Sequence, residues 1–503
     1  MYRPPDSASA AARRALPLAG SPLMIAALAP TLAALPLLPL SAAAQSAPAD
    51  PVEVRTHTAG MAAHHLCSGV FVVGRDYRRD PDRVVEEDIS RFRVFNWQDD
   101  FAYDVDLEAR EATVWGEGIA PQRAEYNGDQ GCTILPAGLD DVTFRPMSVA
   151  RSIPDPTTTP WPTGDAGAFH ETAPREVNMV AVDAALDRAM TREEHNTRAL
   201  VVLYRGKILA ERYAPGFTRN TPQISWSQGK SIASALLGAA IQAGHVDVGL
   251  DDPAPVPEWH GEGDPRSAIR VRDILNMSSG LDFQNWGIGA DSSWTNANEH
   301  FRIYFEGIHV YDHAIDQPTD REPGEIFRYR NSDPLTVMRI VREAAEARGE
   351  EWLTYPQRLL FDRIGARNYV LEPDAWGNFI ITGYDFGSAW DWARFGLLHL
   401  WDGTWPTPDG GRERILPEGW VEFVSTPAPG AADRNYGGLF WLNRGGAWPR
   451  APRDAFWSAG FMGQYTVVIP SYDMVIVRLG PSPANTNPYM SDIIGDVTTA
   501  IER

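Results

Sequence analysis

The chain has 503 residues, and a hydrophobic fraction of 44% with 17 tryptophans is enough for a substantial folded core. Its formal net charge of −21 argues against a protein that binds nucleic acid or an anionic membrane surface. The length allows roughly two to four domains.

Residues 1–44 have the composition of a secretory signal peptide. Three arginines precede an apolar stretch at 23–40, and three alanines at 42–44 provide a cleavage site of small residues. Prolines within this region disfavour a spanning helix, and no later stretch is long and apolar enough to cross a membrane. We expect a periplasmic or secreted protein without stable membrane insertion. The export route stays open, because Arg13-Arg14 could belong to a twin-arginine signal.

Residues 45–150 are predicted to form a small α+β domain. Helical character is expected at Asp80–Ile89, and strands are expected at 103–107, 112–115 and 132–135. The two cysteines of the chain, Cys67 and Cys132, both lie here, and an exported protein meets an oxidising compartment. We therefore predict a disulfide, with two buried free thiols as the alternative. The adjacent His64 and His65 are expected to be surface or packing residues rather than metal ligands.

A linker is predicted at 151–175, where Pro, Thr, Asp and Gly are frequent, and a second domain at 176–503. The second domain is expected to begin with a helix at 182–190 and a hairpin at 199–213. Residues 226–400 are expected to be mostly helical. Strands at 456–458, 464–470 and 474–479 and a helix at 491–503 are expected to follow. Strands at both ends of the domain indicate one sheet, with a helical insertion between its parts.

The stretch that begins at Ser225 predicts the chemical centre of this domain. Apolar residues after Ser227 recur at helical spacing as far as Gly244, so Ser227 is expected in the first turn of a buried helix, with Lys230 on the same face. Of the 45 basic residues only Lys207 and Lys230 are lysines. A buried lysine can lose its proton, whereas an arginine cannot, so Lys230 is a candidate base for a serine nucleophile. A chance Ser-x-x-Lys is the alternative.

Two further stretches contain candidate site residues. Tyr329 and Asn331 stand two apart in an extended run and project to one side. A phenol can relay a proton, and an amide can hold a lysine or a substrate carbonyl group. In 456–465, Gly460 and Gly463 interrupt a strand and allow a ligand to approach the backbone closely. Taken alone, each pattern also fits a purely structural role.

Together the three stretches resemble the penicillin-recognising serine hydrolases. This group includes class C β-lactamases, DD-peptidases, related esterases and the aminohexanoate-oligomer hydrolases. The resemblance covers about residues 175–503, with supporting runs at 271–281 and 415–420. Residues 460–464 are most similar to the aminohexanoate-oligomer branch, and residues 51–150 resemble the extra N-terminal domain of some exported members.

The resemblance implies a role for each candidate residue. Ser227 matches the acylated serine, Lys230 its base, and Tyr329 the residue that passes a proton to the leaving group. Asn331 matches the asparagine of the same motif. The oxyanion hole is expected at the backbone N–H groups of Ser227 and Phe461. The implied fold is an antiparallel sheet flanked by helices, beside an all-helical subdomain with the site between them.

One position departs from the family pattern. Where the family commonly has Lys-Thr-Gly or His-Thr-Gly, this chain has Ser458-Ala459-Gly460. The cation that meets a substrate carboxylate is then missing, unless Arg328 or Arg330 supplies it. We therefore expect neutral acyl substrates to be preferred. The additional substrate-loop tyrosine of the aminohexanoate-oligomer branch is unassigned, with Tyr304 and Tyr311 as candidates.

The predicted fold class is therefore α/β (α+β), β-lactamase-like, after a small N-terminal α+β domain. The predicted function is an exported serine hydrolase that cleaves a small-molecule ester or amide through an acyl-enzyme. No cofactor or metal is expected, since the sequence has neither a His-Glu-x-x-His run nor a glycine-rich phosphate loop. The alternatives are a β-lactamase or DD-carboxypeptidase, and a non-catalytic envelope binding protein that keeps the fold. The sequence does not specify an oligomeric state.

Overall fold

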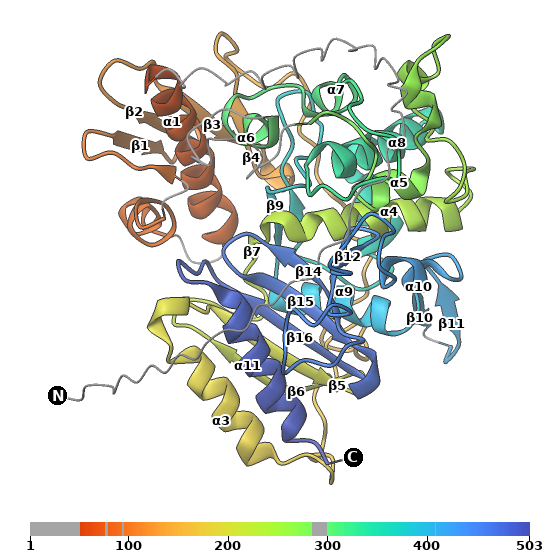
Figure 1. Cartoon of the computed structure of the whole chain (residues 1–503). Coiled ribbons are helices and arrows are strands. Elements are labelled where there is room, and N and C mark those ends of the chain that lie inside the picture. Colours follow the sequence, from red (N-terminus) through yellow and green to blue (C-terminus); the bar gives the residue numbers. More distant parts are fainter. Residues whose placement is uncertain (1–50, 76–78, 93–94, 284–298, 408, 503) are drawn as a thin grey trace, which may run out of the picture. The chain divides into compact units, whose positions relative to one another are not determined.

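The main sheet joins strands from the two ends of the second domain. The structure, a computed structural model, describes residues 51–75, 79–92, 95–283, 299–407 and 409–502. The antiparallel strands lie in the order β12 (Tyr436–Gly437), β13 (Phe440–Leu442), β14 (Phe456–Gly460), β15 (Gln464–Ile469), β16 (Met474–Leu479), β5 (Ala199–Tyr204) and β6 (Lys207–Tyr213). The hairpin predicted at 199–213 is therefore completed by strands from the C-terminal end of the chain (Figure 1).

Helices cover both faces of this sheet, which explains why its central strands are apolar at nearly every position. On one face, α3 (Met179–Met190) packs against α11 (Thr486–Thr499) and against Leu200 (Figure 1). On the other face, α9 (Ala389–Leu400) packs against β5, whose Val201 points to that side. Because successive strand residues point to opposite faces, neighbouring residues of one strand belong to two separate cores.

The helices between β6 and β12 form a largely helical part beside the sheet. Among the described residues, those that precede α9 are α4 (Gly229–Gln242), α5 (Val271–Leu275), α6 (Glu299–Phe305), α7 (Val310–Ile315) and α8 (Ser332–Ala347). α4 packs along α8, and α5 and α7 pack on α8. This arrangement, with the antiparallel sheet and its flanking helices, confirms the predicted fold class.

The same region contains a small sheet that the sequence analysis did not foresee. Its strands are β7 (Gln223–Ile224), β9 (Asp385–Gly387) and β8 (Val370–Leu371), in that order. A two-stranded hairpin, β10 (Thr404–Pro406) with β11 (Arg412–Arg414), and a short helix, α10 (Trp420–Val424), follow later in the chain. Strands of two or three residues are too short for a sequence pattern to show.

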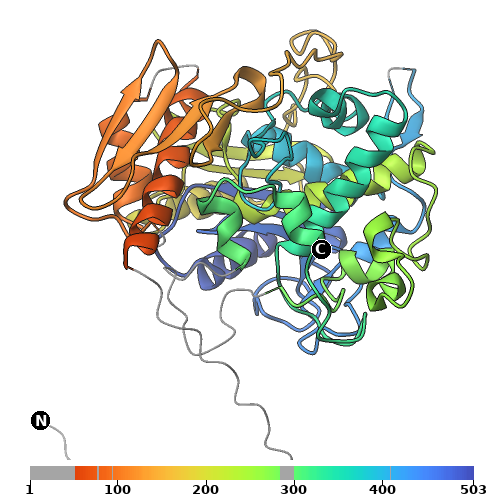
Figure 2. The same ribbon diagram turned by 90° about the horizontal axis from the view of Figure 1, so that it is seen from above.

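The N-terminal part is a long helix packed on a four-stranded antiparallel sheet. α1 (Pro51–Ser68) is followed by α2 (Pro81–Val84) and by helical turns at 69–73 and 85–90. The strands, in sheet order, are β1 (Ala102–Asp106), β2 (Glu111–Trp115), β3 (Gln122–Tyr126) and β4 (Cys132–Leu135). The predicted disulfide is present: Cys67 near the end of α1 is bonded to Cys132 at the start of β4. Figure 2 shows α1 and this sheet at one side of the molecule.

The core of the N-terminal part is continuous with that of the main part. Buried residues of α1 and of α4 belong to a single hydrophobic cluster, and the described residues all lie within one unit, Pro48–Arg503. Residues 151–175 contain no helix or strand, only isolated bridges. The predicted boundaries at 45–150, 151–175 and 176–503 stay predictions, and the predicted signal at 1–44 lies outside the described residues.

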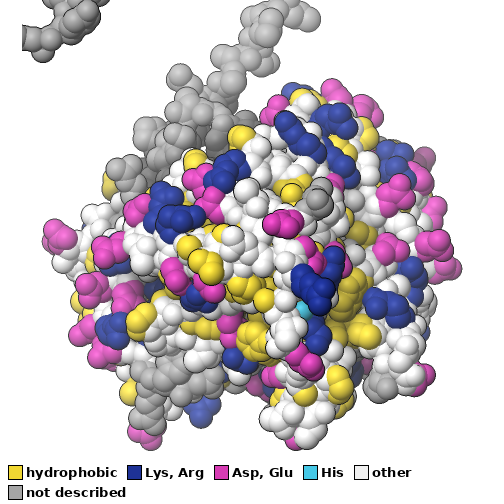
Figure 3. All heavy atoms as spheres, turned by 90° about the horizontal axis from the view of Figure 1, so that it is seen from below, with side chains coloured by type: hydrophobic (Ala, Val, Ile, Leu, Met, Phe, Trp, Pro, Cys, Tyr) yellow, Lys and Arg dark blue, Asp and Glu magenta, His cyan; other side chains and the backbone are white. Residues whose placement is uncertain are grey.

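On one face of the molecule, charge is spread rather than gathered. On the face drawn in Figure 3, acidic and basic side chains alternate, with apolar side chains between them. Within the described part of the chain, no helix combines the length and apolarity needed to span a bilayer.

Candidate active site

The predicted nucleophile lies at the start of a buried helix. A 3₁₀ turn at Trp226–Gln228 leads directly into α4, and Ser227 in that turn is half-buried. Trp226 has a φ of +51°, a left-handed conformation that is costly for a bulky residue and that persists only when the surroundings enforce it. The helix ends at Gln242, and Gly244 has a φ of +68°, in agreement with the predicted stop.

Lys230 lies directly beside the serine. Its Nζ donates to Ser227 Oγ at 2.8 Å and to the carbonyl oxygen of Thr382 at 3.2 Å. The lysine side chain is buried, and this burial lowers the pKa of its ammonium well below the usual value, while Asp385 acts in the opposite direction. A buried amine in contact with a hydroxyl is the arrangement that a lysine base requires.

Tyr329 approaches the same hydroxyl from the segment before α8. It is hydrogen-bonded to Ser227, and its ring centroid lies 4.9 Å from Lys230 Nζ. Burial raises the pKa of the Tyr329 phenol above its usual value, and the bond to Ser227 lowers it in part. The phenol therefore keeps its proton at neutral pH and can donate it.

One backbone carbonyl links several of these groups. Tyr304, on α6, donates to Thr382 O at 2.7 Å, and Asn331 Nδ2 donates to the Tyr304 hydroxyl at 3.1 Å. Lys230 donates to the same Thr382 oxygen. Of the two candidate tyrosines, Tyr304 therefore lies in the site, whereas Tyr311 lies on α7 near Arg342 and Asp374.

Strand β14 forms the opposite wall, and its residues pack on the nucleophile turn. Ser458 is buried, and its Oγ donates to Gln228 Oε1 at 2.8 Å. At Gly460 a Cβ would lie 1.9 Å from the backbone oxygen of Ser225, so only glycine permits this approach. The Phe461 ring contacts Trp226 edge-on, with centroids 5.6 Å apart. The structure thus brings together the predicted residues Ser227, Lys230, Tyr329, Asn331, Ser458, Gly460 and Phe461.

Comparisons with known proteins identify the family of the chain. The family model described as Beta-lactamase matches residues 182–490. The chain belongs to the beta-lactamase family of serine hydrolases. A curated relative, the 6-aminohexanoate-dimer hydrolase of Paenarthrobacter ureafaciens, is 26% identical over 329 residues, which are 62% of this chain and 80% of that protein.

Solved structures with a similar fold include two hydrolases. A putative 6-aminohexanoate-dimer hydrolase from Bacillus anthracis is 20% identical with a TM-score of 0.49, covering 63% of this chain and 81% of that chain. A family VIII carboxylesterase is 14% identical with a TM-score of 0.49, covering 66% of this chain and 99% of that chain.

The candidate site of this beta-lactamase-family chain contains a buried carboxyl group that the sequence analysis missed. Asp385, the first residue of β9, is fully buried near Lys230. No motif identifies it, because it reaches the site through β9, which pairs with β7 just before the nucleophile turn. Only the tertiary fold brings residues so distant in sequence together.

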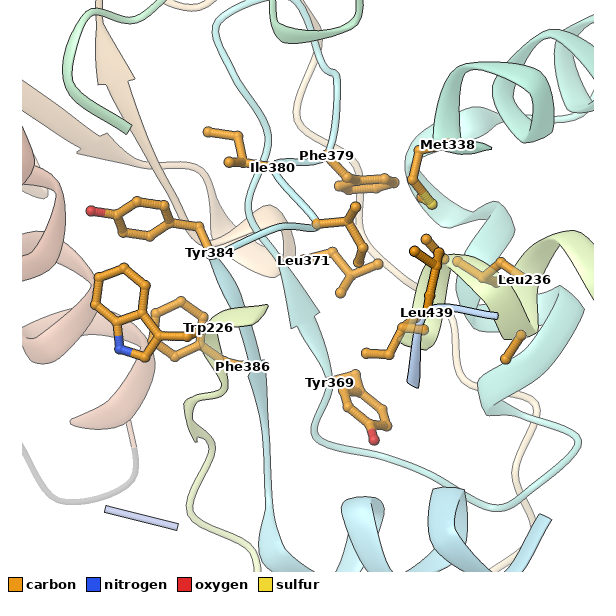
Figure 4. Packing of buried hydrophobic residues seen from close by; sticks show 14 of the residues in the cluster. Trp226, Leu236, Met338, Tyr369, Leu371, Phe379, Ile380, Tyr384, Phe386 and Leu439 are labelled. Carbon is orange, nitrogen blue, oxygen red and sulfur yellow. The ribbon is translucent and has the colours of Figure 1, made fainter. Parts of the chain in front are cut away.

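The two adjacent histidines of α1 also border the site. His64 stacks on Tyr384 with ring centroids 3.7 Å apart, and His65 stacks on Trp226 at 5.9 Å. Both histidines are buried packing residues, which was one of the two predicted alternatives, the other being surface residues. Trp226 and Tyr384 lie side by side in the core (Figure 4), with centroids 6.0 Å apart. The N-terminal part of the chain thus packs on the residue that precedes the nucleophile.

The arginines suspected of replacing the missing family cation are engaged elsewhere. Arg328 forms an ion pair with Asp320 at 2.9 Å. Arg330 is buried and donates to the Leu281 carbonyl oxygen, with Asp333 nearby at 3.7 Å. Both guanidinium groups thus have partners of their own.

One group among the described residues has side chains that could hold a metal ion. Ligand atoms of Glu53, His57 and Glu306 lie within 4.8 Å of one another. Glu306 already accepts two hydrogen bonds from Arg302 and faces His57 Nε2 at 3.3 Å. A cation there would have to compete with the guanidinium.

Proposed function

We propose that this protein is an exported hydrolase of neutral esters or amides that works through an acyl-enzyme on Ser227. The observation that carries the proposal is the 2.8 Å contact between Ser227 Oγ and the buried Lys230 amine. Tyr329, bonded to the same hydroxyl, supplies the second proton-transfer group.

In the proposed first step, the Lys230 amine takes the proton of the Ser227 hydroxyl while the oxygen attacks the substrate carbonyl carbon. Negative charge moves to the carbonyl oxygen, and by family resemblance the backbone N–H groups of Ser227 and Phe461 stabilise it. When the bond to the leaving group breaks, Tyr329 donates a proton to that group and regains one from the Lys230 ammonium. Acid–base catalysis of this kind contributes about 10² to 10⁴ in rate.

In the proposed second step, a water molecule attacks the acyl-enzyme. The same amine accepts a proton from the water, the acid leaves, and the Ser227 oxygen regains its proton. Each cycle therefore consumes one water molecule and restores Lys230 and Tyr329 to their starting protonation states.

The preference for neutral substrates rests on the wall formed by β14. Ser458 offers no charge, and its hydroxyl already donates to Gln228 at 2.8 Å. Arg328 and Arg330 have their own partners. A charge-assisted hydrogen bond is roughly twice as strong as a neutral one, so a substrate carboxylate gains little here. The name of the curated relative, a 6-aminohexanoate-dimer hydrolase, supports amides as a substrate class.

The first test is labelling of the serine. Wild-type protein should react with a fluorophosphonate, and the modified peptide should contain Ser227. The Ser227→Ala variant should lose both labelling and turnover, while its circular dichroism spectrum stays unchanged. Labelling that maps to Ser225 or Ser231 would contradict the assignment.

The second test compares kcat/KM for a nitrophenyl ester and for a chromogenic cephalosporin on one preparation. We expect the ester to be cleaved faster. A cephalosporin rate equal to or above the ester rate would reject the preference for neutral substrates, while leaving the nucleophile assignment intact.

Export is proposed from the composition of residues 1–44 and is supported by the disulfide, which suits an oxidising compartment. The mature protein isolated from the producing cell should begin near residue 45, as read by N-terminal sequencing. A protein that retains Met1 in the cytoplasm would contradict this proposal.

A further inference from the structure

Asp385 is the buried acidic residue packed against the first turn of the nucleophile helix. Its backbone oxygen accepts a hydrogen bond from the Ser225 N–H at 2.8 Å. A Cβ on Gly229 would lie 2.4 Å from Asp385 Oδ1, so the carboxyl group touches the residue that precedes Lys230. The absence of a side chain at Gly229 creates the space for this carboxyl group.

The surroundings of this carboxyl group do not explain its presence. It is fully buried, and among the described residues it forms no ion pair at contact distance. Among the described residues, neither carboxyl oxygen of Asp385 makes a hydrogen bond of good geometry. The Ser225 side chain and the Gly229 N–H nevertheless lie near this carboxyl group. A buried carboxyl group without strong partners is costly, so a purely structural role is a poor account of it.

The charged and titratable groups that act on Asp385 are few. Lys230 is the cation that acts on it, and the phenols of Tyr304 and Tyr369 lie within its electrostatic reach. Burial raises the pKa of the Asp385 carboxyl well above its usual value, and Lys230 counteracts this. In return, Asp385 raises the pKa of the Lys230 ammonium against the effect of burial. Each of the two groups therefore shifts the pKa of the other toward its charged form.

We propose that Asp385 is a positioning residue that acts through Lys230, its carboxylate balancing the ammonium that Lys230 carries after it takes the Ser227 proton. This inference rests on the proposed function of Lys230 as the base. In the active form both groups are deprotonated, so Lys230 is a neutral amine and Asp385 is a carboxylate. When the serine O–H bond breaks and the proton binds Lys230 Nζ, the pair becomes an ammonium beside a carboxylate with no net charge.

The proposal makes a signed prediction for the pH profile. Without the carboxylate, Lys230 alone in apolar surroundings loses its proton at lower pH and is a weaker base. In Asp385→Asn the acidic limb of kcat/KM for the ester should therefore move to lower pH by about one unit, the shift that corresponds to a tenfold change in proton affinity. The plateau rate should fall as well, because a weaker base accelerates the reaction less.

A second readout does not depend on activity. The chain has only two lysines, so selective ¹³C labelling of lysine gives resonances from Lys207 and Lys230 alone. The midpoint of the Lys230 titration should move to lower pH in Asp385→Asn, and the Lys207 resonance serves as the internal reference for assignment. Should Asp385→Asn fail to fold, Asp385→Ser removes the same charge with a smaller side chain.

Asp391→Asn is the matched control. Asp391 is equally buried but accepts from the N–H groups of Arg367 and Asn368 and from Ser388, so its loss should lower stability without moving the acidic limb. If neither the acidic limb of kcat/KM nor the midpoint of the Lys230 titration moves in Asp385→Asn, the inference is overturned. Wild-type protein that is not acylated on Ser227 would instead reject the proposed function, so the two failures are distinguishable.

Discussion

At the scale of single residues, Lys230 is defined by what surrounds it rather than by its motif alone. Burial lowers the pKa of its ammonium, Ser227 receives its hydrogen bond, and the Tyr329 ring lies 4.9 Å away. A solvated lysine at the same spacing would stay charged at neutral pH and could not act as a base.

Lys230→Arg keeps the positive charge but cannot lose the proton. We expect kcat/KM for an ester to fall by about 10²-fold or more, the range of a removed acid–base group. Lys207→Arg, which changes the other lysine of the chain in a distant hairpin, is the control and should be fully active. Near-normal rates in Lys230→Arg would show that this lysine is structural.

Gly460 tests how closely β14 must approach the nucleophile turn. In Gly460→Ala the new methyl group would lie 1.9 Å from the Ser225 backbone oxygen, and neither backbone can move cheaply. We expect a lower melting temperature and at least a tenfold loss in kcat, since small displacements at a site cost large factors in rate. Gly261→Ala, with open space around its Cβ, should be close to wild type in both measurements.

At the scale of elements, α1 acts as a support for the nucleophile turn. Its His65 lies between Trp226 and Phe95, and its C-terminal end is joined to β4 by the disulfide. Burial lowers the pKa of His65 to about 4, with Asp88 acting in the opposite direction, so the ring is neutral at pH 7. Its contact with Trp226 is therefore aromatic packing rather than an interaction of charge.

His65→Ala should remove the support for the left-handed backbone at Trp226. We expect kcat to fall severalfold with a smaller change in KM, because the nucleophile moves while the substrate wall does not. His65→Phe should restore most of the rate, since it keeps a ring in place.

His195→Ala is the matched control, because His195 is also buried and stacks on Tyr489 at 3.9 Å, away from the site. This control should lose stability but keep its kcat. Equal effects of the two alanine variants on kcat would contradict a positioning role for His65.

At the scale of the whole molecule, Asp88 joins the N-terminal part to the main sheet. It accepts from Arg79 in its own part of the chain and from Arg198, which precedes β5. Burial raises the pKa of the Asp88 carboxyl, but the two guanidinium groups outweigh it, so that the pKa lies below its usual value. The carboxylate therefore contributes stability that is complete above the unfolded pKa of about 3.9 and is lost as pH falls toward the folded pKa.

Asp88→Ala removes the buried carboxylate that the two guanidinium groups share and leaves them only the half-buried Glu87. We expect the free energy of unfolding at pH 7 to fall by about 3–5 kcal/mol, the usual cost of breaking a buried ion pair. The difference from wild type should shrink as the pH falls below about 4, where wild type loses this contribution itself. Urea titrations at pH 7 and pH 3.5 measure both effects, and a difference independent of pH would contradict the ionic explanation.

The sequence by itself determined the local parts of the site. Helical periodicity after Ser227 with one turn to Lys230 and the glycine break at Gly460 are short-range patterns, and each was found where it was predicted. Asn331, expected in an extended run with Tyr329, instead has a helical conformation at the N-cap position of α8. Alternation and turn residues likewise predicted the 199–213 hairpin and the strands near the C-terminus. Such patterns are visible because neighbouring residues must satisfy one local geometry.

Only the tertiary structure decided what surrounds those parts. Asp385, Thr382 and His65 carry no local signal, since each reaches the site from an element far along the chain, through sheet pairing or helix packing. These residues contact the nucleophile turn in a buried environment. Because water is excluded there, a single charge has a larger effect on its neighbours than it would have in solvent. The motif therefore specified which side chains meet, and the fold decided the electrostatic environment in which they act.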